Sequence, residues 1–342
     1  MNKWLLVYCW LIQAIVTGVD SGIFIVLATC NGSAFLAEQL DSLLAQSETR
    51  WSLLIRDDHS VDGTPDIIRN YARMDSRIRV VKDDQGASGS PLVSFSLLLS
   101  AAHEQGAEFV FCCDQDDHWH PDKLALILDQ FEKTGRDPEV PCLIHHDLAV
   151  VDRNLKEINP SFVAMMGLSP ADQANPQRLL SRNEVTGCSM ACNRALLEIA
   201  LPLPGDAIMH DWWLALCAGY FGKLSFMPQQ LVKYRQHGEN VIGAKSFWQG
   251  LNPFNNWVAG WQAGNREFLA SVVQARAFQT TMAERLNLES GGAKALDTYC
   301  KLPRSGRLER LSALKRCSLW RHQWILDTVL VLRMLLLPRE QP

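Results

Sequence analysis

The feature that most restricts the fold is a regular alternation of short apolar runs and amphipathic segments that begins near residue 23. The apolar runs have the length and composition of buried strands. They are "IFIVLAT" (23–29), "WSLLIRDD" (51–58), "RIRVVKDD" (77–84) and "EFVFCCD" (108–114). The segments between and after them repeat apolar residues at helical spacing. They are 33–46, 64–74, 91–105 and 121–133, with Thr64 as the expected N-cap of the second and Pro65 at its first helical position. Strand and helix units of this length predict parallel strands joined by crossover helices, hence an α/β sandwich.

The second half of the sequence is less regular. "CLIHHDLAVVD" (142–152) and "LSFMPQQLVKYRQH" (224–237) are predicted strands, and the chain from about residue 246 is predicted to be mainly helical. At 342 residues the chain is long enough for one large domain or two small ones.

Polar residues end each of the first four predicted strands. Thr29, Asp57, Asp83 and Asp114 stand at these ends. In open α/β sheets, ligands bind outside the carboxyl ends of the strands. Four such residues on one rim therefore predict a binding site there.

The "DQDD" sequence (114–117) places two carboxylates, Asp114 and Asp116, on either side of one residue. A tight turn can aim both at one centre, and Mg2+ or Mn2+ commonly bridges protein carboxylates to phosphates. Without a cation, such crowding would raise the pKa values of the acids. For this tetrapeptide alone, an ordinary acidic helix start is the other interpretation.

Composition excludes some classes of function. The formal net charge of -4 argues against a broad nucleic-acid-binding surface. Ten cysteines are scattered without a CxxC pair, which favours free thiols in a reducing compartment over a disulfide framework.

Both ends of the chain carry apolar segments. Residues 4–19 are too short for a comfortable membrane span, so a signal peptide, a peripheral anchor and an extended start all stay open. Near the other end, the basic segment 301–321 leads into "WILDTVLVLRMLLL" (324–337). This combination suits an anionic membrane surface, although a packed C-terminal helix has the same pattern.

Six ordered segments between residues 22 and 243 carry a family resemblance. They are "IVLATCNG" (25–32), "IRDDHSVDGT" (55–64), "FCCDQDDHWHPDKL" (111–124), "TGCSMACNRALL" (186–197), "HDWW" (210–213) and "YRQHGENVIG" (234–243). Together they resemble the inverting, nucleotide-sugar-dependent glycosyltransferases of family 2. Within that family, "DQDDHWHPDKL" (114–124) followed by "HDWW" and "YRQHGENVIG" resembles the bacterial rhamnosyltransferase subgroup, which builds surface polysaccharides.

The resemblance implies a GT-A fold: a Rossmann-like α/β sandwich with a mainly parallel mixed sheet, here followed by a helical C-terminal extension. It divides the chain into an apolar extension (1–21), the glycosyltransferase domain (22–245) and a helical, membrane-associating region (246–342). The protein would lie at the cytoplasmic face of the cell membrane. Its partners would be a dTDP-rhamnose or UDP-sugar donor and a lipid-linked or polysaccharide acceptor, with no nucleic acid.

The resemblance also implies a role for each matching residue. Asp211 would be the general base, and Trp212 would stack on the acceptor. Asp116 and His237 would hold a divalent metal, Mg2+ or Mn2+. The nucleotide sugar would be bound by Thr29, Asn31, Asp57, Gly86, Asp114 and Arg235. Ser90 and Pro91 replace an Asn and an aromatic residue that relatives carry, which leaves donor choice open.

Two competing functions make different demands on the sequence. Another metal-dependent nucleotide enzyme would need a glycine-rich, basic loop after the first strand, whereas "ATCNGSAFL" (28–36) has one glycine and no basic residue. A catalytically silent, membrane-associated sugar-binding protein of the same fold would be expected to have lost the metal acids or the base, and all are present.

Overall fold

The structure, a computed structural model, describes residues 22–81, 86–134, 137–168, 175–237, 257–320 and 324–340. The apolar extension 1–21 and Asp83 lie outside this range.

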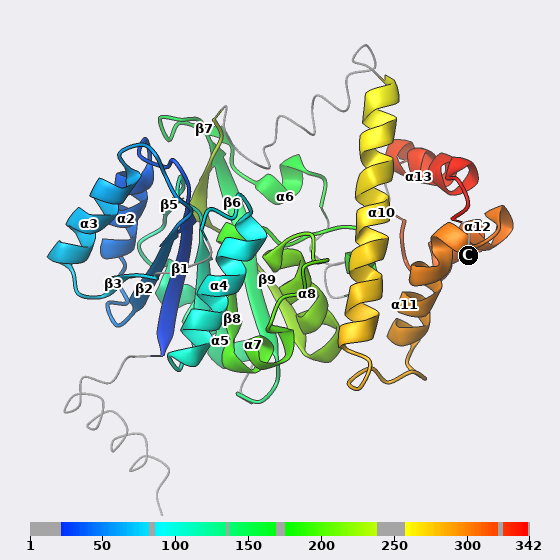
Figure 1. The fold of residues 1–342 in the computed structure, drawn as a ribbon, viewed down its shortest axis with the longest axis horizontal. Helices are drawn as coiled ribbons and strands as arrows, with labels where there is room; N and C mark the ends of the chain where they lie inside the picture. Colours follow the sequence, from blue (N-terminus) through cyan, green and yellow to red (C-terminus); the bar gives the residue numbers. More distant parts are fainter. Residues whose placement is uncertain are drawn as a thin grey trace, which may run out of the picture.

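The first half of the sheet is parallel, as the alternating pattern predicts. Strand β1 (Ile23–Thr29) lies between β2 (Ser52–Asp57) and β4 (Phe109–Cys113), and β3 (Ile78–Val80) extends the sheet beyond β2. The connecting helices are α2 (Leu36–Leu44), α3 (Thr64–Met74) and α4 (Pro91–Glu104). Figure 1 shows α2 and α3 together at the blue end of the molecule, with α4 in front of the sheet.

The second half makes the sheet mixed. Strand β8 (Met190–Asn193) runs antiparallel to both β4 and β6 (Cys142–Val151), and the long β9 (Lys223–Arg235) runs parallel to β6. Two short strands complete it: β5 (His118–Trp119) pairs with β9, and β7 (Glu157–Asn159) pairs with β6. The helices of this half are α5 (Lys123–Thr134), α6 (Phe162–Met165), α7 (Arg194–Ala200) and α8 (His210–Phe221). The GT-A-like α/β fold class is thus confirmed.

The start of α3 differs from the expectation. Thr64 is the first helical residue rather than the N-cap, and Gly63 occupies the cap position without a side-chain bond. Asp62 supplies the missing acceptor: its carboxylate takes hydrogen bonds from the backbone N–H of Thr64 (3.0 Å) and of Ser33 (3.1 Å). Pro65 follows at the second helical position, where its missing N–H costs no helical bond.

The C-terminal helices pack into the same core as the sheet domain. They are α10 (Trp257–Thr281), α11 (Gly291–Lys301), α12 (Arg307–Arg316) and α13 (Trp324–Leu336). Phe278 of α10 meets Trp213 of α8 edge to face, with ring centroids 5.4 Å apart, and one apolar cluster runs from β1 to α13. The boundary at 245/246 stays a prediction, but the helices beyond it share their core with α8.

Two further expectations can be compared with the structure. Each of the nine described cysteines is a free thiol, and all but Cys30 are buried. Among the described residues, no helix is long and apolar enough to cross a bilayer.

Candidate functional site

The loop after β1 is tied to the turn after β4 by one side chain, Gln115. Its Oε1 accepts hydrogen bonds from the Thr29 hydroxyl (2.6 Å) and the Cys30 N–H (2.9 Å). Gly32 makes this approach possible, because a Cβ there would lie 2.4 Å from the same oxygen. Sequence analysis singled out Thr29 but missed Gln115, whose partners are more than 80 residues away.

Two other expected nucleotide-binding residues, Asn31 and Asp57, meet at Ser60. The Ser60 hydroxyl accepts from the Asn31 N–H (2.7 Å) and donates to the Asp57 carboxylate (2.5 Å). Asn31 adopts φ 51°, a left-handed conformation that asparagine tolerates better than most residues. The structure thus places Thr29, Asn31 and Asp57 along one stretch of the sheet edge, where Thr29 and Asp57 are register partners.

Asp58 is a structural residue that sequence analysis missed. Its buried carboxylate accepts from the Arg56 guanidinium (2.9 Å) and from the N–H groups of Ser88 (2.7 Å) and Gly89 (2.8 Å). Burial opposes ionisation, yet these donors lower the pKa of Asp58. Asp58 thereby fixes the loop that contains Gly86, which has φ +73° and was expected to line the donor site.

The turn after β4 crowds its carboxylates together. Burial, followed by the charges of Asp116 and Asp211, raises the pKa of Asp114 to about 7. Burial, followed by the charges of Asp116 and Asp114, also raises the pKa of Asp117. Asp114, Asp117 and the Cys188 thiol bring possible ligand atoms within 4.8 Å of one another.

A buried lysine lies beneath this turn. Lys123 donates to the Cys188 carbonyl (2.7 Å), and its ammonium lies 3.5 Å from the centre of the Trp119 ring. Burial lowers the pKa of Lys123 to about 8. Its charge opposes the raised pKa of Asp114, so it is a counter-charge for the turn. The sequence pattern predicts only that "PDKL" (121–124) begins a helix, and it does not predict this role for Lys123.

The expected metal pair is brought together. His237, two residues beyond the end of β9, has its Nε2 2.7 Å from Asp116 Oδ2, and its ring lies against Phe35. These residues are 121 positions apart in the sequence. Their role as metal ligands stays a prediction.

Arg235 differs from its expected position over a diphosphate. Its side chain is 1% exposed and lies over the Phe35 ring. The guanidinium donates to the Asp116 carbonyl (2.7 Å), the Glu38 carboxylate (2.6 Å) and the Arg153 carbonyl. The Arg235 N–H also donates to Asp117 (3.0 Å). Arg235 therefore holds the Asp114–Asp117 turn from behind, and it could reach a diphosphate only if these bonds broke.

Asp211 lies in the first turn of α8, 7% exposed. Its Oδ1 accepts from the Asn183 side-chain amide (3.0 Å) and the Trp212 N–H (2.6 Å), and the Gly187 N–H also donates to the carboxylate. Burial nevertheless raises the pKa of Asp211 to about 7, because these donors only partly offset it. Asn183 and Gly187 were not predicted, and no local motif marks them.

The Trp212 side chain is buried, although the resemblance implies that it stacks on the acceptor. It is 5% exposed, its indole N–H donates to the Leu179 carbonyl (2.5 Å), and its ring belongs to the main apolar cluster. The role of Trp212 in acceptor binding stays a prediction, and in this structure its ring is packed in the core. A tryptophan at this point of a helix buries its large apolar surface whenever its N–H finds a partner. The neighbouring Trp213 is fully buried as well.

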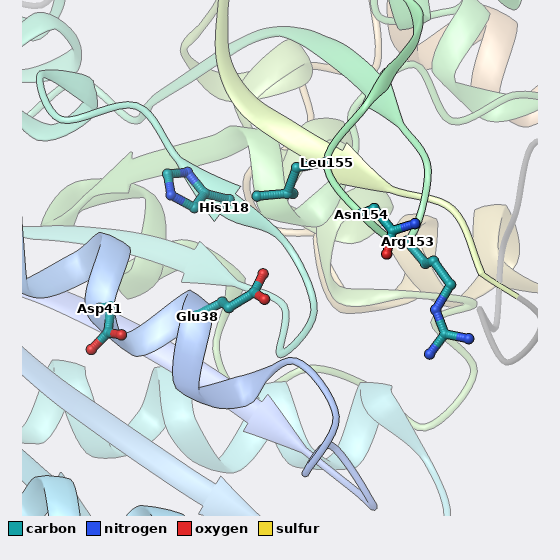
Figure 2. Close-up of a pocket in the computed structure, with 6 residues that line it drawn as sticks. All are labelled: Glu38, Asp41, His118, Arg153, Asn154 and Leu155. Atoms are coloured by element: carbon teal, nitrogen blue, oxygen red, sulfur yellow. The ribbon is translucent and has the colours of Figure 1, made fainter.

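An open cleft lies beside Glu38 and Arg153, two of the residues that Arg235 contacts. It is lined by Glu38 and Asp41 of α2, His118 of β5, and Arg153, Asn154 and Leu155 of the β6–β7 turn. Figure 2 shows these polar side chains spread around the cleft rather than converging on one point. None of the expected site residues lines it.

Comparison with known proteins identifies the family. The family profile described as glycosyl transferase family 2 matches residues 24–199, just over half of the chain. An uncharacterized glycosyltransferase of Nostoc is 26% identical over 64% of this chain and 66% of its own. A dTDP-rhamnosyl transferase of Shigella flexneri, RfbG, is 25% identical over 64% and 74%. Among solved structures, S. aureus TarS 1–349 in complex with UDP-GlcNAc is 13% identical, with a TM-score of 0.49, over 91% and 88%.

The family profile covers most of the sheet domain. The chain spans just under two thirds of the length of the Nostoc relative. The profile match includes the loops of Thr29, Asp57 and Asp114, although it ends before Asp211. The chain therefore belongs to glycosyl transferase family 2.

Proposed function

We propose that this protein transfers a sugar, with inversion, from a nucleotide-diphosphate donor to a hydroxyl of a lipid-linked or cell-surface polysaccharide acceptor. Asp211 acts as the general base. The rim formed by Thr29, Asn31, Asp57 and Asp114 holds the donor, and the Gly86 loop borders it.

The observation that carries this proposal is the state of Asp211. A general base works best when its pKa lies near the operating pH, and burial raises that of Asp211 to about 7. The Asn183, Gly187 and Trp212 donors fix the carboxylate without fully compensating its charge. The charge of Asp211 also raises the pKa of Asp114, so the proposed base and the proposed donor-binding carboxylate influence each other electrostatically.

The residues at the turn fit a divalent cation. Three neighbouring aspartates, two of them with raised pKa values despite the counter-charge of Lys123, form an arrangement that a cation would stabilise. Asp116 and His237 would hold it, with Asp114 beside them, since carboxylate and imidazole groups suit Mg2+ or Mn2+ better than the Cys188 thiol does. A bound divalent ion would offset the charge that develops on the departing diphosphate.

The proposed donor is dTDP-L-rhamnose. Support comes from the 25% identity with RfbG of Shigella flexneri, named a dTDP-rhamnosyl transferase. A role in polysaccharide assembly is supported by a second relative, TuaG of Bacillus subtilis, named a putative teichuronic acid biosynthesis glycosyltransferase, which is 34% identical over 31% of this chain.

A thermal-shift screen tests the proposal directly. The protein is heated with dTDP-rhamnose, UDP-glucose, UDP-GlcNAc and GDP-mannose, each with and without Mn2+. A ligand that binds only the folded state raises the melting temperature. We expect the largest rise with dTDP-rhamnose plus Mn2+, and a smaller rise when Asp116 is replaced by Asn.

Different results would overturn different parts of the proposal: the donor, the function or the inverting mechanism. A larger shift with another nucleotide sugar would overturn rhamnose as the donor while leaving sugar transfer in place. No shift with any nucleoside diphosphate, with or without Mn2+, would overturn the proposed function. Retention of the donor's anomeric configuration in the product, read by NMR, would overturn the inverting mechanism.

A further inference from the structure

Helix α13 has an apolar face on its outer side as well as its inner side. Its inner side is buried against the other C-terminal helices through Leu330, Met334 and Leu337. On the outer side, Trp324, Thr328, Leu332 and Leu336 recur every four residues, which places them on one helical face. Trp324 is 80% exposed and Leu336 62% exposed, and Ile325 beside them is 47% exposed.

Helix α13 also carries Asp327 and Arg333, but a helical face with this many large apolar side chains is normally buried. Within the described part of the chain, the outer face of α13 stays open to solvent, and Figure 1 shows the helix at the end of the molecule opposite α2 and α3. Leu308 at the start of α12 adds another large apolar side chain, 84% exposed. This region therefore holds an apolar surface that needs a partner.

The same region is strongly cationic, in contrast to the chain as a whole. From residue 301 to the end, nine basic residues stand against three acidic ones, whereas the whole chain has a formal net charge of -4. Six of the basic side chains are exposed in the structure. They are Lys301, Arg304, Arg307, Lys315, Arg316 and Arg339.

Contacts made by two arginines bring the basic and apolar groups together. Arg310 is buried and donates to the carbonyls of Leu302 (2.9 Å) and Leu337 (2.6 Å), so it joins the start of α12 to the end of α13. Arg339 donates to the Arg304 carbonyl (2.7 Å). The exposed Arg307, Leu308 and Arg304 are thereby held near the end of the apolar face that Leu336 occupies.

We propose that the outer face of α13, together with the basic residues of α12 and its flanks, docks on an anionic lipid bilayer. Apolar side chains would enter the interface, while the arginines and lysines pair with lipid phosphates. A second copy of this chain fits the surface less well, because two such cationic regions would repel each other. The proposal concerns attachment and does not depend on which reaction the protein catalyses.

The test is co-sedimentation of the full chain with phosphatidylcholine vesicles, with and without about one third phosphatidylglycerol. Each basic residue near an anionic surface is worth about a fivefold change in affinity, so several together predict binding on the order of a hundredfold tighter to the anionic vesicles. Higher salt should weaken this binding, because it screens surface charge.

Two variants with matched controls separate the apolar and electrostatic parts. Replacing Trp324, Leu332 and Leu336 by Ser should weaken vesicle binding at least about tenfold. Replacing Arg307, Lys315 and Arg316 by Gln should remove most of the preference for anionic vesicles. Leu288→Ser and Lys133→Gln, which change exposed residues elsewhere, should leave binding unchanged. Unaltered melting by circular dichroism shows that each variant folds.

Equal binding to neutral and anionic vesicles would overturn the proposal, as would binding that survives both sets of substitutions. So would a wild-type dimer that the apolar variant converts to a monomer in sedimentation velocity without any vesicle binding, because the surface would then be an interface between copies.

Discussion

Two loops of this protein carry three aspartates each within a few residues, and they hold them in opposite ways. In the loop after β2, Asp58 and Asp62 have lowered pKa values, because hydrogen-bond donors outweigh the effect of burial. In the turn after β4, Asp114 and Asp117 have raised pKa values, because burial and mutual repulsion outweigh the donors they have. The donors around the first loop stabilise its ionised aspartates, whereas the donors around the second turn do not offset burial and repulsion.

The two loops contain the same number of aspartates, so the difference in pKa comes from the hydrogen-bond donors that surround them. Asp62 fixes the start of α3, and Asp58 fixes the loop of Gly86. Asp114, in contrast, lies beside like charges that a ligand could neutralise. Asp211 resembles the aspartates of the turn after β4, since its three donors leave its pKa near 7.

Asp58→Asn should have the largest effect on stability. The substitution removes the carboxylate that pairs with the Arg56 guanidinium, which is 1% exposed, and it turns an amide group toward the Ser88 and Gly89 N–H groups. Removing one partner of a buried ion pair costs about 3–5 kcal/mol. Urea denaturation measures the loss. Asp57→Asn, which alters an acid held mainly by Ser60, should cost less than about 1 kcal/mol, and equal losses for the two variants would break the comparison.

Asp211→Asn should instead raise the free energy of unfolding, by an amount that depends on pH. A folded-state pKa of about 7, above the ordinary value of 3.8, means that the native state binds the extra proton between these values. Stability contributed by the protonated form is therefore present at low pH and lost as pH rises through 7. Wild type should lose about 2–3 kcal/mol between pH 5 and pH 8 from this group, and the variant should not.

Unfolding of both proteins in urea at the two pH values measures that effect. The asparagine keeps an oxygen for the Asn183 and Trp212 donors, so the variant should fold. An identical change in stability between pH 5 and pH 8 for both proteins would mean that Asp211 is not the strained carboxylate described here.

Gly32→Ala should have the smallest effect. Its new Cβ would lie 2.4 Å from Gln115 Oε1, so Gln115 would have to leave Thr29 and Cys30. The loss of these hydrogen bonds predicts about 1–2 kcal/mol lower stability and weaker nucleotide binding. Gly63→Ala is the control, because its Cβ would meet only Ser33 at an ordinary 3.5 Å. Equal melting temperatures for the two variants would show that Gln115 adapts without cost.

The sequence predicted the first half of the fold well because its signals are local. Apolar runs such as 23–29 and amphipathic segments such as 64–74 identify strands and helices without knowledge of their partners. The insertion of β8 between β4 and β6 depends on pairing between distant segments, and no local pattern specifies it.

The site was predicted unevenly for the same reason. Motifs identified Thr29, Asp57 and Asp114 at the sheet edge, and they correctly paired Asp116 with His237 in space. The motifs did not predict how deeply two of the site residues are buried. Arg235 and Trp212 were expected to face ligands, but they find partners such as Glu38 and Leu179, which lie far away in the sequence. Side chains with polar tips become structural once a distant partner satisfies them.

The most direct test of the central claim is the pH dependence of sugar transfer by wild type and by Asp211→Asn, with any nucleotide sugar that the thermal screen selects. If Asp211 is the base, kcat/KM of the wild type should rise about tenfold per pH unit up to about pH 7 and then level off. The variant should be slower by about 100- to 10,000-fold and should lack this rise. Transfer by the variant at the wild-type rate, with the same pH dependence, would contradict the account.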